Sequence, residues 1–229
     1  MKDFAGMFLT VLLAAAALVL MAAGFMVWDQ PVLQAVRAGV AKDWQEMARF
    51  LSRYGDFPFL LAAGAVALAL SLRLRTASWS RLLTAMILAG IIAGLASNVV
   101  KLGAGRVRPR VEQVAHGWYG PTHEDQWVSL RHDFQSFPSS HAACAFGFFW
   151  PLFLSRRWLG AAGLLLAAAI AWSRVQLNAH HVSDVAAGAL LGMLAGWLVW
   201  RWLVARGGLS RWLGGQDVRT AEGNPAPVR

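Results

Sequence analysis

Three short segments of the sequence carry ionisable and polar side chains at the edges of long apolar runs. The side chains in these segments that could act in catalysis or bind an anion are Lys101, Arg108, Ser139, Ser140, His141, Arg174, His180 and Asp184. Charged groups next to hydrocarbon are costly and are usually functional. Cations, imidazoles and a single carboxylate form a set that suits the binding of an oxyanion.

The three cations are best suited to a phosphate group. Arg108 and Arg174 each offer a planar fork that matches two phosphate oxygens, and Lys101 adds a point charge. Residues 138–141 would begin a helix, where backbone N–H groups and the helix dipole favour an anion. We therefore predict one phosphate site built from all three segments.

The histidines could supply the chemistry at such a site. His180 and Asp184 are four residues apart, so on a helix they share a face and the carboxylate can accept a hydrogen bond from the imidazole. This contact fixes the tautomer and leaves the other nitrogen free to attack phosphorus. His141 can then protonate the leaving oxygen. The scheme needs no metal ion.

Each of these residues has a simpler explanation when it is taken alone. A Lys or Arg at the end of a span is often an interfacial anchor, and His141 could cap a helix. Metal binding by His141, His180 and His181 is a stronger alternative, but the sequence has one nearby carboxylate and no His-Glu-x-x-His spacing. The convergence of the whole set on one membrane face favours phosphate chemistry.

The rest of the chain must hold these segments at a membrane. Hydrophobic residues make up 57% of the 229 residues, charged residues make up 14%, and the mean hydropathy is +0.47. Soluble domains are nearer a quarter charged, and the single cysteine excludes a disulfide-stapled scaffold. Uncharged runs cover 4–28, 57–72, 82–100, 142–155, 158–173 and 185–200. They predict an all-α integral membrane protein with six transmembrane helices.

The other segments predict how the chain is organised around these spans. The first run exceeds the roughly 7–15 residues of a signal-peptide core, so we expect a retained anchor. Residues 29–56 mix apolar and charged residues at helical spacing, which predicts a short interfacial amphipathic helix between spans one and two. We expect one membrane domain over 1–206 and a flexible cytoplasmic tail over 207–229.

The basic residues predict the sidedness of the chain. Six spans place both termini on one side, together with loops 73–81 and 156–157, and this side has the higher density of Lys and Arg. The termini are therefore predicted to be cytoplasmic, and the polar segments to lie on the periplasmic or exterior face of the inner (plasma) membrane. The formal charge of +9 reflects this asymmetry, and we expect no nucleic-acid partner.

The spacing of the three segments resembles that of the type 2 phosphatidic acid phosphatase (PAP2) family. The matching residues are Lys101-x6-Arg108-Pro109, Pro138-Ser139-Ser140-His141 and Ser173-Arg174-x5-His180-x3-Asp184. The family pattern often has glycine at the position of Ser140. A serine there disfavours a positive φ, which predicts a slightly altered phosphate pocket. Because the backbone N–H is kept, activity is expected to survive.

The resemblance implies a membrane lipid phosphatase that needs neither metal nor cofactor and forms a phosphohistidine intermediate. It implies that His180 is the nucleophile, that Asp184 orients it and that His141 is the general acid. The implied phosphate-binding residues are Lys101, Arg108, Ser139, Ser140 and Arg174. The implied partners are membrane lipids, and the implied substrates are undecaprenyl diphosphate, phosphatidylglycerophosphate, phosphatidate and a lipid A phosphate.

Other functions fit the same residues. One is a lipid-to-lipid phosphotransferase, and another is a lipid-phosphate binder or transporter without turnover. Vanadium haloperoxidases have a similar signature, but they are soluble. His181 is expected to pack or to face solvent, and Arg106 and Arg110 to contact a second phosphate or headgroup or to anchor at the interface. Headgroup selection is expected in the loop 111–135.

Overall fold

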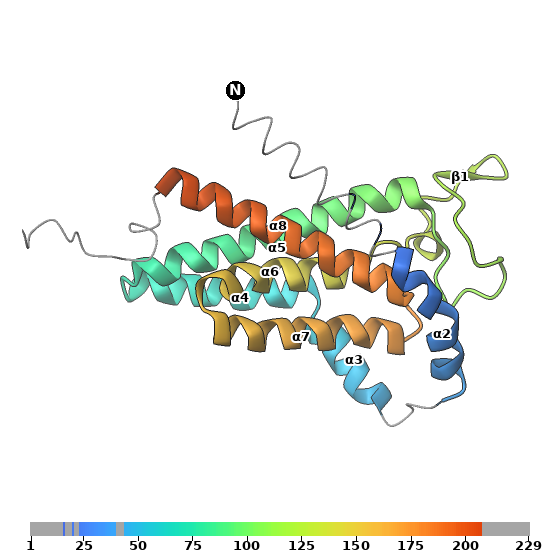
Figure 1. Ribbon diagram of the computed structural model, residues 1–229, viewed down its shortest axis with the longest axis horizontal. Coiled ribbons are helices and arrows are strands. Elements are labelled where there is room, and N and C mark those ends of the chain that lie inside the picture. Colours follow the sequence, from blue (N-terminus) through green and yellow to red (C-terminus); the bar gives the residue numbers. More distant parts are fainter. Residues whose placement is uncertain (1–15, 17–19, 21–22, 40–43, 208–229) are drawn as a thin grey trace, which may run out of the picture.

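Long helices form the body of the protein in this computed structural model, which describes residues 16, 20, 23–39 and 44–207. The bundle in Figure 1 consists of α4 (Phe57–Arg73), α5 (Ala77–Ala104), α6 (Ser140–Ser155), α7 (Arg157–Gln176) and α8 (Val182–Gly207). A 3-10 turn, η1 (Met26–Trp28), and two short helices, α2 (Asp29–Arg37) and α3 (Gln45–Tyr54), precede it. The α5–α6 connection contains an antiparallel pair, β1 (Thr122–His123) and β2 (Gln126–Trp127), and the turn η3 (His132–Phe134).

Several of the helices are membrane spans by length and composition. Among the described residues, α5, α7 and Val182–Leu203 of α8 are long and apolar enough to cross a membrane. Helices α3 and α4, bent by 54° at their junction, count as a fourth if the pair is one span. The protein is therefore a mostly helical membrane protein. The predicted apolar runs from 57 onward all lie in helices. The predicted first span at 4–28 and the predicted tail at 207–229 lie largely outside the described residues.

The segment 29–56 forms two helices rather than the single helix predicted. Gly39, at φ 76°, follows α2 in the left-handed conformation that ends helices. Helix α2 packs against α7 and α8, and its buried residues include Asp29. Helix α3 packs against α7 and buries Ala48 and Ser52. Both helices therefore bring polar side chains against the bundle.

Helix α6 lies at the centre of the bundle and packs against α5, α7 and α8 (Figure 1). Its contact with α8 requires glycine. A Cβ at Gly188 would lie 2.4 Å from the carbonyl oxygen of Ser139, and one at Gly192 would lie 2.4 Å from that of Ala143. Real Cβ atoms do not approach a backbone so closely. The small residues thus place the start of α8 directly beside the start of α6.

The chain between α5 and α6 has an apolar cluster of its own. Gly105 caps the end of α5. Its φ of 56° is left-handed and a Cβ there would lie 1.8 Å from the Gly120 carbonyl oxygen, so no side chain fits. A separate group of buried residues, Val107, Val111, Val128 and Phe134, fills the loop. Because this cluster fixes the loop backbone, the arginines on either side of Val107 are held in defined positions.

Candidate functional site

The three polar segments meet at one end of the bundle, where α5 ends and α6 and α8 begin (Figure 1). The carbonyl oxygen of Gln135 accepts hydrogen bonds from Lys101 Nζ at 3.1 Å and from Arg108 Nη2 at 3.2 Å. Arg108 also donates from Nη1 to the carbonyl oxygen of Ala179 at 3.4 Å. Two of the predicted phosphate-binding residues are thus neighbours, and one of them reaches the residue that precedes His180.

Arg108 remains charged although it is buried. Burial, helped by the positive charges of Arg110 and Arg174, lowers the pKa of Arg108 to about 10. The guanidinium is therefore still protonated at neutral pH. Lys101 is also buried, at 6% exposure. Buried cations this close together favour the binding of an anion, because a negative charge offsets both their desolvation and their mutual repulsion.

Two further polar atoms at this end are buried without partners. Arg174, near the end of α7, donates from Nη1 to Ser52 Oγ of α3, while its Nε has no partner in the described part of the chain. Ser139 Oγ also has no partner among the described residues, whereas the backbone N–H of Ser139 donates to the Asp184 carbonyl oxygen at 2.9 Å. Buried polar atoms rarely lack a partner. Both atoms are donors that a bound phosphate could use.

His180 and Asp184 come together differently from the prediction. His180 lies in the turn before α8, and its Nδ1 is 3.7 Å from Asp184 Oδ2, which is too far for a hydrogen bond. Nδ1 is instead 2.7 Å from the carbonyl oxygen of Ser136. The Ser136 hydroxyl donates to Asp184 Oδ2 at 2.5 Å. The two side chains thus lie within ion-pair distance, but the predicted direct hydrogen bond is replaced by a chain of contacts through Ser136.

This contact fixes the tautomer of His180. A carbonyl oxygen only accepts, so Nδ1 carries the proton and Nε2 keeps a free lone pair in the neutral ring. Burial lowers the pKa of His180 to about 3, although Asp184 acts in the opposite direction. The imidazole is therefore neutral at pH 7, as a nucleophile must be.

His141 faces a carboxylate that the sequence did not indicate. Its Nε2 is 3.2 Å from Asp56 Oδ1, a distance that allows an ion pair when the imidazole is protonated. The same carboxylate oxygen accepts from the N–H of Phe57 at 2.8 Å and caps α4. The junction of α3 and α4 thus contacts the residue expected to act as general acid.

Ser140 fits its position without strain. It begins α6 and is not among the residues with positive φ. Its hydroxyl lies 2.9 Å from Ser97 Oγ and donates to Asn98 Oδ1 at 3.2 Å, so it binds α5. The expected conflict between a serine side chain and a positive φ is therefore wrong, because no positive φ is needed here.

The flanking residues separate into buried and surface groups. His181 is buried and its N–H donates to Asp184 Oδ2 at 2.8 Å, so it packs and does not face solvent. Arg110 is half-exposed and lies 3.6 Å from Asp133 at the loop surface. Arg106 is buried against carboxylates, so it neither anchors at an interface nor faces a headgroup. Within the described ranges, no three His, Cys, Asp or Glu side chains are grouped as metal ligands.

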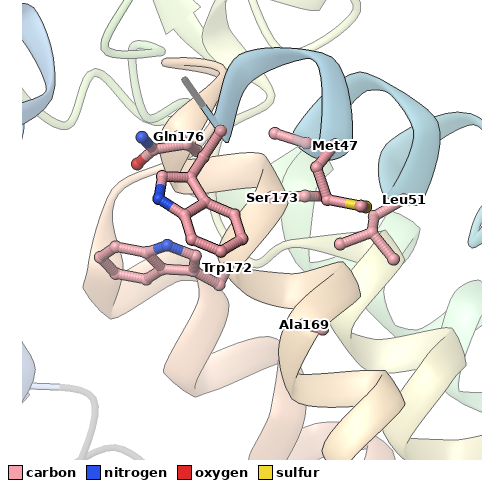
Figure 2. A pocket seen from close by; sticks show the side chains of 8 residues that line it. Met47, Leu51, Ala169, Trp172, Ser173 and Gln176 are labelled. Carbon is pink, nitrogen blue, oxygen red and sulfur yellow. The ribbon is translucent and has the colours of Figure 1, made fainter. Parts of the chain in front are cut away.

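An apolar groove of about 380 Å³ lies between α3 and α7 (Figure 2). Its walls are Trp44, Met47, Ala48, Leu51, Ala169, Trp172, Ser173 and Gln176. Leu51 and Ser173 directly precede Ser52 and Arg174, the two residues that bond across the helices. Two of the groove residues are therefore the chain neighbours of the Ser52–Arg174 contact.

Sequence reasoning missed the residues that hold the site together. Ser136, Asp56, Ser52 and Asp29 all contact a predicted site residue or its partner. Only Ser136 could have been suspected from the sequence, because it lies two residues before the segment that begins at Pro138. The other three lie far away in the sequence, and no spacing connects them to the motifs.

A model of the PAP2 superfamily matches residues 78–207, which contain all of the predicted site residues. The chain is also similar to YbjG of Escherichia coli (strain K12), provisionally named an undecaprenyl-diphosphatase. The two are 34% identical over 98 residues, 41% of this chain and 44% of that protein. A lipid A 4'-phosphatase of Bacteroides thetaiotaomicron is 39% identical over 64 residues, 27% of this chain and 28% of that protein. The chain thus spans less than half the length of these curated relatives.

A solved structure shares the fold over a larger part of the chain. It is a transmembrane PAP2-type phosphatidylglycerolphosphate phosphatase from Bacillus subtilis, which superposes with a TM-score of 0.62 at 21% identity. The match covers 83% of this chain and 94% of that one. The helical arrangement is therefore one that a membrane phosphatase also has.

We expect the buried neutral His180 to make the protein sensitive to acid. In the unfolded chain a histidine binds a proton near pH 6.5, whereas the native site resists protonation until about pH 3. The unfolded state binds more protons in this window, so the stability contributed by His180 is present above pH 6.5 and is lost as the pH falls toward 3. The apparent unfolding temperature in detergent should therefore fall more steeply between pH 7 and pH 4 for the wild type than for His180→Asn. Asparagine keeps an N–H for Ser136 but does not titrate, and equal slopes would contradict the assignment.

Proposed function

Because the chain belongs to the PAP2 superfamily, we propose that it is a lipid phosphatase that hydrolyses a phosphate ester or diphosphate carried by a membrane lipid. The observation that carries the proposal is the state of His180. Its Nδ1–H is bound by the Ser136 carbonyl oxygen, which leaves a free lone pair on Nε2. Arg108 contacts the preceding residue, and Lys101 shares an acceptor with Arg108.

In the first chemical step, His180 Nε2 attacks phosphorus and forms an N–P bond. The bond between phosphorus and the leaving oxygen breaks, and His141 gives its proton to that oxygen. The released product is a lipid alcohol for a monoester and a lipid monophosphate for a diphosphate. The positive charges of Lys101, Arg108 and Arg174 stabilise the charge on the equatorial oxygens, and Ser139 Oγ supplies one further donor.

In the second step, water attacks the phosphohistidine. His141, now neutral, accepts a proton from the water, the N–P bond breaks, and inorganic phosphate leaves. Both residues return to their starting states. Asp184 neither gives nor takes a proton. We assign it the role of holding Ser136 and, through the Ser136 carbonyl oxygen, the imidazole of His180.

The groove between α3 and α7 supports a lipid as the substrate. It is apolar, and its residues Leu51 and Ser173 directly precede Ser52 and Arg174 in the chain. A lipid whose phosphate is bound by Arg174 could extend its hydrocarbon chain along the walls shown in Figure 2. The names of the relatives suggest undecaprenyl diphosphate, a lipid A 4'-phosphate and phosphatidylglycerophosphate. Phosphatidate, implied by the family resemblance, completes the set of substrates.

We also propose six spans, with cytoplasmic termini and with the site on the periplasmic or exterior face of the inner membrane. The domain then covers 1–206, with α2 and α3 at the interface and the tail 207–229 in the cytoplasm. The distribution of Lys and Arg supports this orientation. All eight site residues then lie near one membrane surface, at the end of the bundle where the loop 105–139 is found.

Phosphate release is the direct test of the activity. Purified protein in detergent should release inorganic phosphate from at least one of the four lipids with excess chelator present. His180→Asn should lower that rate on the order of 1,000-fold or more, because the amide keeps the donor to Ser136 but removes Nε2. Labelled phosphate that appears on a second lipid would instead identify a phosphotransferase. Binding of these lipids without turnover would identify a binder, and chelator-sensitive release would contradict the metal-free scheme.

A tryptophan in the groove should discriminate against long-chain substrates. Ala169→Trp should raise KM for the preferred lipid about tenfold, or about 1.4 kcal/mol, and leave KM for soluble p-nitrophenyl phosphate unchanged. Ala168→Trp is the matched control, because Ala168 is the exposed neighbour on the same helix and is not a groove residue. Equal effects of the two variants, or equal effects on the two substrates, would contradict the assignment of the groove.

A reporter fused after Arg229 tests the proposed orientation. Alkaline phosphatase fused there should be inactive, because this enzyme folds only outside the cytoplasm. Green fluorescent protein fused there should be fluorescent. The same pair fused within the loop 111–135 should give the opposite result. An active alkaline phosphatase after Arg229 would invert the topology.

A further inference from the structure

Arg106 and Asp29 form a buried charge network behind the proposed nucleophile. Arg106 Nη1 lies 2.5 Å from Asp184 Oδ1, and its Nη2 lies 2.7 Å from Asp29 Oδ2. Exposure of the three side chains is at most 8%. Ser183 joins the same group, because its N–H and hydroxyl donate to Asp29 at 2.9 Å and 2.6 Å. The network therefore connects α2, the loop after α5 and the first turn of α8.

The charges in this network depend on Arg106. Asp29 and Asp184 are buried carboxylates that flank one guanidinium, so removal of the cation would leave two like charges in a region of low dielectric. The two carboxylates would then repel each other, and Asp184 would lose one of the donors that hold it. Arg106 thus keeps Asp184 in place, and Asp29 orients Arg106 by holding its second terminal nitrogen.

The position of Asp184 in turn determines the position of His180. Asp184 Oδ2 accepts from the Ser136 hydroxyl, and the Ser136 carbonyl oxygen accepts from His180 Nδ1. Arg106 acts on Ser136 a second time, because the backbone N–H of Ser136 donates to the Arg106 carbonyl oxygen at 3.0 Å. Trp118 covers the guanidinium, whose Cζ is 4.7 Å from the ring centroid. The Arg106 side chain is therefore held by an aromatic ring as well as by two carboxylates.

We propose that Arg106, held by Asp29, is a positioning residue that keeps Asp184 oriented, so that Ser136 presents His180 with Nε2 free. The inference rests on the proposed phosphatase function and extends it to a part of the chain outside the matched residues 78–207, because Asp29 precedes them. The described hydrogen bonds of the Arg106 side chain go to Ser183, Asp184 and Asp29, and none goes to a predicted phosphate-binding residue. Loss of Arg106 should therefore affect the chemical step more than phosphate binding.

The test is the kinetics of Arg106→Gln on the lipid that the wild type hydrolyses best. We expect kcat to fall about 100-fold, the scale of a misplaced reacting group, with KM within about threefold of the wild-type value. Arg106→Lys should recover part of the loss. Arg110→Gln is the matched control, because Arg110 is in the same loop but half-exposed, and it should stay within about twofold of wild type.

Asp29→Asn distinguishes positioning from a merely structural role. It should lower kcat less than Arg106→Gln, and the double variant should be no slower than Arg106→Gln alone if Asp29 acts only through Arg106. All rates are given per folded molecule. Size-exclusion elution and the unfolding temperature report whether each variant is folded. If Arg106→Gln does not fold, Asp29→Asn and Arg106→Lys decide the question.

An unchanged kcat per folded molecule in these variants, with His180→Asn inactive, would overturn the inference and leave the proposed function standing. A KM effect without a kcat effect would also overturn it. If the wild type itself releases no phosphate from any of the four lipids, the proposed function has failed instead. The two failures are thus separated by the wild-type and His180→Asn controls.

Discussion

A buried carboxylate in the first turn of α8 is the constraint on which the rest of the site depends. Asp184 is fully buried, so each of its oxygens must find donors within the protein. They come from Arg106, from the Ser136 hydroxyl and from the His181 backbone. These donors belong to two separate parts of the chain. Satisfying one side chain therefore fixes the α5–α6 loop against the start of α8.

The same requirement explains why the loop needs an apolar cluster of its own. Arg106 and Arg108 lie on either side of the buried Val107, and one turns toward Asp184 while the other turns toward the carbonyl oxygens of Gln135 and Ala179. Residues two apart on an extended strand lie on the same face, so the two side chains diverge because the loop backbone is irregular here and is held in that form. Val107, Val111 and Phe134 hold it. The carboxylate network and the cations proposed to bind phosphate are thereby kept apart, although the sequence places Arg106 and Arg108 two residues from each other.

Much of the fold and of the candidate site could be predicted from the sequence. The apolar runs from residue 57 onward form helices because a helix satisfies all the backbone hydrogen bonds of such a run within the run itself. Lys101, Arg108, His141 and His180 were identified because charge beside hydrocarbon is rarely incidental.

Contacts could not be predicted in the same way. The i,i+4 spacing indicated a direct bond between His180 and Asp184, but α8 begins at Val182, so the imidazole lies outside the helix and Ser136 bridges the gap. Asp29 and Asp56 are single carboxylates whose partners are distant in the sequence, and only the packing of α2 and of the α3–α4 junction brings them to the site.

The hydrogen bond between Ser52 and Arg174 has a consequence for how such a protein can diversify. Helix α3 supplies one wall of the apolar groove and, one residue further on, the hydroxyl that holds the guanidinium. A substitution that widens or narrows the groove to suit another tail length shifts the same helix that orients Arg174. With the groove as the proposed tail site and Arg174 as a proposed phosphate ligand, chain-length preference and the rate of phosphorus chemistry are not independent traits. Lineages that adapt to a new lipid would be expected to change residues in α3 and at the end of α7 together.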